Sequence, residues 1–306
     1  MDIQRLKPHF PWITLLVLVT IVGIADPSFL KPANLLSLAG DIVPLFIMAL
    51  GLTFAIYIGG IDLSAQSMAN MITVVASVCL APLGIWVAAL CILAGFTLGT
   101  LSGYLTTRMY VPSFISTLAV GGICFSVAQW LSGNRALNMD ATQRNETFGW
   151  MIGRTGIVPH ELFIAIGLLA ICLLIERRTV LGRALKAVGA GELAAAASGL
   201  NVARYKILAF AISGGLAAVA GLLFSVKLSG GAPTIANGFL LPAIVAVLVG
   251  GTPLTGGVGG VLNVAVIRAS MLYFGIAATQ QQMVFGLVLI AAIALTIDRS
   301  KLRTVK

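Results

Sequence analysis

Ten long apolar segments constrain the fold of this chain more than any other feature. A helix needs about 20 apolar residues to cross the hydrocarbon core of a bilayer. Hydropathy predicts all-α spans at about 10–26, 41–59, 64–81, 84–106, 113–131, 160–176, 206–226, 238–252, 257–275 and 280–297. The eighth segment is short and ends in Gly250 and Gly251, so we expect a broken or re-entrant helix there. The sequence therefore predicts one polytopic membrane domain over 1–306, with about ten transmembrane helices.

The composition excludes most other classes of protein. Of the 306 residues, 59% are hydrophobic and 9% are charged, whereas a soluble domain has about 25% charged residues. A water-facing surface needs more charge than this, so a soluble enzyme and a nucleic-acid-binding protein are both excluded. The four cysteines lie in apolar runs without a CxxC pair or a nearby histidine, and we expect neither a disulfide framework nor a metal site.

The basic residues predict the orientation. If the N-terminus is inside, the inner loops hold 13 of the 19 lysines and arginines, the outer loops hold five, and Arg268 remains within a span. Because cytoplasmic loops are enriched in lysine and arginine, both termini are predicted to be cytoplasmic. Two loops are long enough to be functional: 132–159 outside, which could receive a ligand or a docking partner, and 177–206 inside.

The inner loop contains a short run of strong helix formers, Glu192 to Ser198, between Gly191 and Gly199. Two interpretations stay open: a docking helix that enters a groove on a partner, or an amphipathic helix that lies on the membrane. The residues assigned to docking are Gly191, Glu192, Leu193, Ala194, Ala195, Ser198 and Gly199.

Five segments of the chain resemble, in order and spacing, the membrane subunits of ATP-binding-cassette importers of the ribose/xylose/arabinose branch. They are GGIDLSAQS (59–67), VPSFISTLA (111–119), GRALKAVGAGELAAAASGLNVARYK (182–206), LLPAIVAVLVGGTPLTGGVGG (240–260) and QQMVFGLVLI (281–290). The resemblance implies a permease of the bacterial inner membrane that takes up a monosaccharide or a similar polar small molecule by alternating access.

The same resemblance implies the partners. A second permease chain would complete the pathway, two cytoplasmic ATP-binding subunits would bind the docking helices, and a periplasmic substrate-binding protein would deliver the solute. The chain itself has no GxxxxGK[ST] phosphate loop. We therefore expect it not to be an enzyme and to hold no cofactor, with ATP used by the partner subunit.

Polar residues within spans are candidates for the translocation pathway, because they are costly in lipid and tend to face water or the protein interior. Gln66, Asn70 and Thr73 share one face of the third span, and Asn263 and Arg268 lie in the ninth. Neutral amides suit a sugar that must bind weakly and leave. We predict that Gln66, Asn70, Asn263 and Arg268 line the pathway, and hydrogen bonding between helices is the alternative for the face of Gln66 and Asn70.

Two charged residues have open roles. Arg268 contacts substrate, pairs with a buried acid such as Asp62 or Asp41, or lies outside a misplaced span. Asp62 follows the second span in a cytoplasmic turn, where Asp-x-Ser is typical of a helix N-cap; contact with the ATPase or gating of the inner mouth is the alternative.

The alternative function is an ion-coupled secondary transporter of a small polar solute. Proton coupling needs carboxylates within the membrane, and Asp41 and Asp62 lie at the ends of spans, which counts against it but leaves sodium coupling through carbonyls open. Uptake that survives without ATP would favour this alternative.

Overall fold

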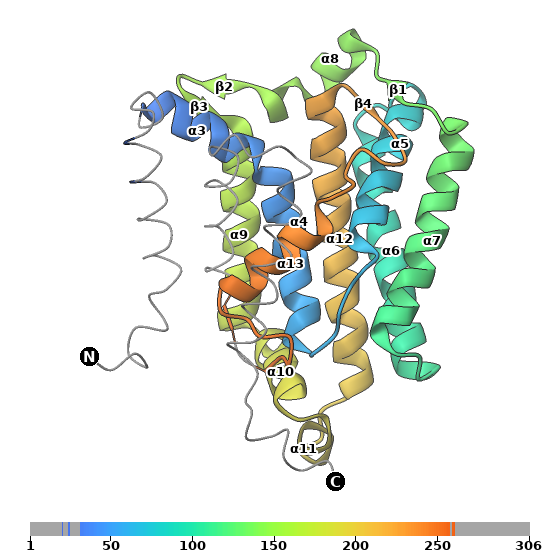
Figure 1. Cartoon of the computed structure of the whole chain (residues 1–306), viewed down its shortest axis with the longest axis vertical. Coiled ribbons are helices and arrows are strands. Elements are labelled where there is room, and N and C mark those ends of the chain that lie inside the picture. The colour runs from blue at the N-terminus through green and yellow to red at the C-terminus, as the bar shows by residue number, and fades with distance from the viewer. Residues whose placement is uncertain (1–19, 21–23, 25–30, 258, 261–306) are drawn as a thin grey trace.

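The computed structural model describes residues 20, 24, 31–257 and 259–260. Most of the first predicted span and nearly all of the ninth and tenth lie outside these residues, as do Asn263 and Arg268. Within them the chain is a bundle of helices that run between two ends (Figure 1).

Within the described residues, seven helices form the bundle, and all of them except α3 follow the predicted apolar segments closely. They are α3 (Pro32–Asp41), α4 (Val43–Tyr57), α5 (Ala65–Leu83), α6 (Trp86–Arg108), α7 (Ser113–Ser132), α9 (His160–Arg178) and α12 (Val202–Leu228). In the described part of the chain, α5, α6, α7 and α12 are each long and apolar enough to cross a membrane. The bent pair α3 and α4, which meet at 52°, would make a fifth crossing. The second predicted span, 41–59, corresponds to α4, and α3 lies before it, so the bend falls at the start of that span.

The shorter elements lie mainly at the two ends of the bundle. They are β1 (Leu137–Asn138), α8 (Ala141–Ile152), β2 (Arg154–Thr155), β3 (Val158–Pro159), α10 (Val180–Ala190), α11 (Glu192–Ala197), β4 (Gly230–Gly231) and α13 (Leu240–Val249). We call the end with α10 and α11 the α11 end, and the opposite end, with α8 and the strands, the α8 end (Figure 1). At the α8 end β1 pairs with β4, and β2 forms a hairpin with β3, both antiparallel.

Helix α13 is the predicted eighth span, and it is short. Its ten residues extend about 15 Å, half the thickness of a bilayer core. Figure 1 shows it lying obliquely within the bundle, below an irregular segment that descends from β4. The eighth predicted span is therefore a helix too short to cross a bilayer by itself, and an irregular segment, 232–239, precedes it.

Helix α12 forms the centre of the bundle and packs against α4, α5 and α6. The contact with α6 depends on three glycines spaced four residues apart, Gly95, Gly99 and Gly103. A Cβ at Gly99 would overlap the backbone of Phe210, and a Cβ at Gly95 would overlap that of Gly214. Small residues at this spacing let helices approach closely in lipid, which accounts for the three glycines on this face of α6.

An ionic cluster fastens α12 to α3 and α9 at the α8 end. Lys227, in the last turn of α12, lies 2.9 Å from Asp41 and 3.3 Å from the buried Glu161. Its ammonium group also donates to the carbonyl of Gly40 at 3.0 Å. The sequence analysis named Asp41 as a possible partner of Arg268, and in the structure Asp41 pairs with Lys227.

Candidate translocation site and coupling surface

The segment between α4 and α5 enters the bundle instead of forming a surface turn. Helix α4 ends at Tyr57 and is followed by Gly59, which has φ of +68°. The N–H groups of Gly59 and Gly60 donate to the carbonyls of Ile56 and Ala55. This pattern is the Schellman helix stop. The chain then reaches α12 at Ser213, about 17 Å along that helix from its start at Val202. Helix α5 therefore begins inside the bundle.

Asp62 is buried at this point, with 2% of its surface exposed. Its Oδ2 accepts a 2.6 Å hydrogen bond from Ser213, and its Oδ1 accepts bonds from the amide and the hydroxyl of Ser64 at 2.9 and 2.5 Å. The N-cap residue of α5 is Ser64, whose side chain makes no cap. The expected N-cap in a cytoplasmic turn is thus corrected: Asp62 is an interior carboxylate that ties α5 to α12, because the loop turns inward.

The polar face of α5 binds backbone, not another helix. Its side chains follow the segment 232–239 as the segment descends beside α5. The bonds join Thr73 to Ala232 at 3.3 Å, Asn70 Oδ1 to the amide of Ala236 at 2.6 Å, and Gln66 Oε1 to the amides of Gly238 and Leu240 at 3.0 and 3.2 Å. Irregular backbone at membrane depth needs such partners, because no water is available in hydrocarbon. The side chains on this face of α5 therefore provide hydrogen-bond partners for the backbone of the irregular segment.

Gln66 and Asn70 also meet a third amide, that of Asn237, which the sequence analysis missed. Asn237 Oδ1 accepts from Asn70 Nδ2 at 2.9 Å and from Gln66 Nε2 at 3.4 Å. Asn70 is buried, Gln66 is half-buried and Asn237 is exposed. Asn237 directly precedes the predicted span 238–252, and this position could have marked it as a candidate. It was passed over because it was assigned to a loop outside the membrane.

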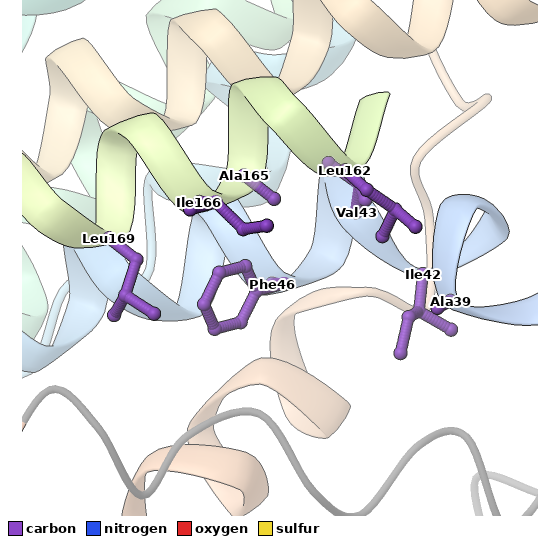
Figure 2. Close-up of a pocket in the computed structure, with 8 residues that line it drawn as sticks. All are labelled: Ala39, Ile42, Val43, Phe46, Leu162, Ala165, Ile166 and Leu169. Atoms are coloured by element: carbon purple, nitrogen blue, oxygen red, sulfur yellow. The ribbon is translucent and has the colours of Figure 1, made fainter. Parts of the chain in front are cut away.

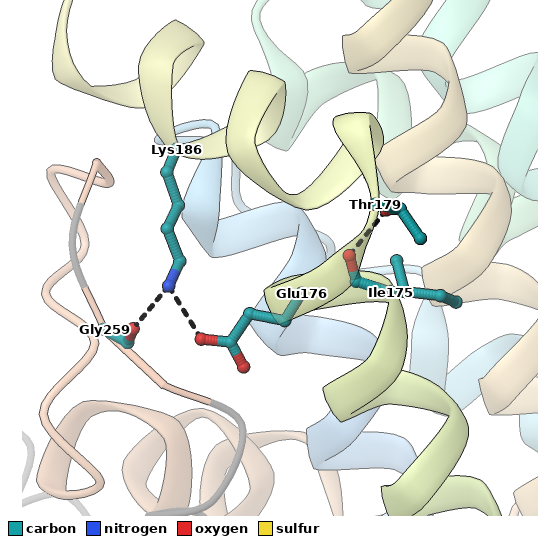
Figure 3. A network of polar contacts seen from close by, with 5 residues as sticks. All are labelled: Ile175, Glu176, Thr179, Lys186 and Gly259. Carbon is teal, nitrogen blue, oxygen red and sulfur yellow. Dashed lines mark hydrogen bonds and ion pairs between the residues drawn. The ribbon is translucent and has the colours of Figure 1, made fainter.

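The α11 end joins α10, α4 and the loop 250–260. Gly257 donates to the carbonyl of Tyr57 at 3.0 Å. Lys186 of α10 pairs with Glu176 at 2.7 Å and donates to the carbonyl of Gly259 at 3.1 Å (Figure 3). A Cβ at Gly189 would overlap the Tyr57 carbonyl, so α10 fits closely against the end of α4.

The two glycine-rich motifs GGIDLS and GGTPLT end their helices in the same way. Gly251 has φ of +89° and bonds back to Leu248, and Thr252 bonds back to Val247. By its backbone conformation Gly251 corresponds to Gly59. An alignment of the sequences GGIDLS (59–64) and GGTPLT (250–255) would instead pair Gly250 with Gly59, so the two alignments differ by one residue.

Helix α11 is the predicted helix of the inner loop, and it ends one residue earlier than expected, at Ala197. Gly199 has φ of +82° and stops it, and Leu200 bonds back to Ala195. Glu192 forms an ion pair with Lys206 of α12. Leu193 is 89% exposed, while Ala195 is buried, so the helix presents one large apolar side chain to its surroundings.

Helix α10 was not predicted, because its sequence contains Gly182 and Gly189. These glycines serve packing: a Cβ at Gly182 would overlap the carbonyls at the end of α9. Thr179 is the N-cap residue of this helix, and its side chain accepts a hydrogen bond from the amide of Gly182. Thr179 also donates to Ile175 at 2.6 Å (Figure 3).

An apolar pocket lies between α4 and α9 (Figure 2). Its lining includes Val43, Phe46, Ala165 and Leu169, and each of its eight lining side chains is a hydrocarbon. A polar solute would find no hydrogen-bonding side chain there.

Comparisons with known proteins identify the family. Residues 34–293 match the family described as the branched-chain amino acid transport system / permease component. The ribose import permease protein RbsC of Escherichia coli (strain K12) is 33% identical, covering 92% of this chain and 91% of its own. RbsC of Bacillus subtilis (strain 168) is 32% identical, over 95% and 90%. The xylose transport system permease protein XylH of Escherichia coli (strain K12) is 30% identical, over 80% and 79%.

No solved structure matches the chain. The family match nevertheless spans most of the sequence, from the start of α3 to beyond the described residues. The chain therefore belongs to the permease-component family of branched-chain amino acid transport systems, and it is a permease subunit.

Proposed function

We propose that this chain is the membrane-spanning subunit of an ATP-binding-cassette importer that admits a monosaccharide or a similar polar small molecule. The similarity to ribose import permeases over 92% of the chain carries the proposal. An ion-coupled secondary transporter is disfavoured by the same similarity, because the relatives are permease subunits of import systems.

The site at the start of α5 suits a neutral, hydroxyl-rich solute. Gln66, Asn70 and Asn237 offer amides, which both donate and accept hydrogen bonds, as hydroxyl groups do. Asp62, a carboxylate close to this level in the described part of the chain, is occupied by two serines. An amino acid zwitterion would need charged partners. We assign Gln66 to the pathway wall, with Asn70 behind it, and we place Asn263 and Arg268 on the same pathway as a further proposal.

The partners follow from the two ends of the bundle. The α11 end faces the cytoplasm of a bacterium, in accordance with the positive-inside rule, and α11 enters a groove on a separate ATP-binding subunit. The exposed Leu193 provides an apolar anchor for that contact. The α8 end faces outward and receives a substrate-binding protein, and a second permease chain completes the pathway. Both termini are then cytoplasmic, and about ten helices cross the inner membrane.

Force on α11 has a direct route to the site. Helix α10 leads into α11 and packs against both Tyr57 and Gly257. The segment after Tyr57 leads to α5, and the loop that contains Gly257 follows α13. A shift of α10 therefore moves the segment that leads to α5 together with the loop that follows α13. Rigid-body alternating access requires such a joint movement.

Reconstitution tests the proposal. The permease is placed in proteoliposomes with its ATP-binding subunit and binding protein, and uptake of radiolabelled D-ribose and D-xylose is measured. We expect uptake of one of these sugars that requires both ATP and the binding protein. Uptake that proceeds without ATP would overturn the proposal in favour of ion coupling. Loss of uptake of both sugars, with ATP-driven uptake of leucine, would reject the sugar specificity.

A further inference from the structure

One amide is exposed at the level where α5 and α13 begin. Asn237 is exposed, whereas Asn70, which binds it, is 1% exposed. The Oδ1 of Asn237 accepts from both Asn70 Nδ2 and Gln66 Nε2. Because the hydrogen-bond network decides which way an asparagine amide is turned, two donors on one oxygen fix the amide orientation of Asn237. Its Nδ2 group, with two hydrogens, then points away from Gln66 and Asn70.

The remaining acceptors of this network are already occupied. Asn70 Oδ1 is bound by the amide of Ala236, and Gln66 Oε1 by those of Gly238 and Leu240. Among the described residues, none accepts a hydrogen bond from Asn237 Nδ2. The cluster therefore satisfies its oxygens internally and presents donors outward.

The depth of Asn237 makes this exposure significant. Helix α5 meets α12 at Ser213, through Asp62, and at Gly221, which contacts Ala69. Gln66 and its partner Asn237 thus lie at the level of the middle of the 27-residue α12. An amide that faced lipid there would leave its donors without partners, and polar groups at this depth face water or protein instead.

We propose that Asn237 is a substrate-contacting residue of the translocation pathway. Its Nδ2 group donates to a hydroxyl or ring oxygen of the sugar as the sugar passes the starts of α5 and α13. This inference rests on the proposed function and names a contact within it. Gln66 and Asn70 are positioning residues for this contact, since they hold the amide in one orientation. A single neutral amide binds weakly, and release of the sugar needs weak binding.

The substitution Asn237→Asp removes the two N–H donors of the Asn237 amide and keeps its accepting oxygen. A carboxylate of the same shape still accepts from Gln66 and Asn70, but it cannot donate. We expect uptake in the reconstituted complex to fall about tenfold, the effect of one lost hydrogen bond to the passing sugar. Subunit assembly and ATP hydrolysis stimulated by the binding protein should be retained. Asn201→Asp, at the exposed N-cap of α12, is the matched control: its oxygen only accepts a hydrogen bond from the amide of Arg204, which a carboxylate also accepts, so this variant should transport normally.

Unchanged uptake by Asn237→Asp would overturn this proposal while leaving the proposed function intact. Loss of assembly in parallel with uptake would also overturn it, because Asn237 would then be structural. If the unaltered complex shows no uptake that depends on ATP and binding protein, the proposed function fails instead.

Thiol labelling tests the position of Asn237 without knowledge of the sugar. Asn237→Cys is made in a chain whose four native cysteines are replaced by alanine, and the assembled complex is treated with a membrane-impermeant methanethiosulfonate. We expect labelling at residue 237, because the position faces an aqueous pathway in at least one state of the ATP cycle. Ile123→Cys, at an exposed apolar position of α7, should stay unlabelled. Absence of labelling at 237 both with and without ATP would overturn the proposal.

Discussion

The hydroxyl of Ser213, in the interior of α12, donates a 2.6 Å hydrogen bond to the buried carboxylate of Asp62. This bond joins the irregular segment before α5 to the central helix of the bundle. Ser213→Ala should lower the stability of the permease by about 1 to 3 kcal/mol, because it leaves a buried carboxyl group with one hydrogen-bond partner fewer. Thermal unfolding in detergent measures this change. Ser77→Ala is the control, since Ser77 bonds only to a carbonyl of its own helix, and an equal effect of the two changes would contradict the prediction.

The glycine contact between α6 and α12 predicts a much larger defect. Gly99→Leu should prevent formation of a monodisperse permease, because the side chain would occupy the place of the Phe210 backbone. Gly122→Leu is the matched control on α7, where a Cβ meets no atom within 4 Å. Size-exclusion chromatography in detergent distinguishes them. A normal elution profile for Gly99→Leu would show that the two helices do not meet as described.

The exposed Leu193 predicts an effect on the partner alone. Leu193→Asp should abolish co-purification of the ATP-binding subunit and ATP-dependent uptake, because it places a charge in an apolar contact. The permease itself should elute normally, since Leu193 is 89% exposed. Ile157→Asp, between β2 and β3 at the α8 end, is the control and should retain the subunit. Retention of the ATP-binding subunit by Leu193→Asp would place the docking surface elsewhere.

The ionic cluster at the α8 end predicts an asymmetry between its two acids. Lys227→Met should destabilise the bundle by about 3 to 5 kcal/mol, because the buried Glu161 is left uncompensated. Adding Glu161→Gln should restore part of that loss. Asp41→Asn should cost less than about 1 kcal/mol, since the Asp41 side chain is 55% exposed. Thermal unfolding of the four chains checks this order, and an equal loss for Asp41→Asn would contradict it.

The sequence predicted the long helices well, because an apolar run of bilayer length has few other folds available to it. Helices α5, α6, α7, α9 and α12 begin and end within a few residues of the predicted spans. Helix α11 was also predicted, since alanines between glycines specify a helix and its ends. The count of ten spans and the orientation stay predictions.

What the polar face of α5 contacts could not be predicted. Periodicity places Gln66, Asn70 and Thr73 on one side of a helix, but it does not say whether that side meets a helix, water or an irregular segment. The segment 232–239 has no period of its own, so its descent beside α5 becomes visible only in three dimensions. The burial of Asp62 was missed for the same reason, because glycines that permit a surface turn also permit an inward loop.

The glycine contact of α6 with α12 and the amide cluster on α5 depend on different residues. Substitutions at positions 66, 70 and 237 leave the α6–α12 glycine contact unchanged, and Gly95, Gly99 and Gly103 make no hydrogen bond to the segment that the amides hold. The packing of α6 on α12 is therefore independent of the hydrogen bonds that hold the segment 232–239 beside α5.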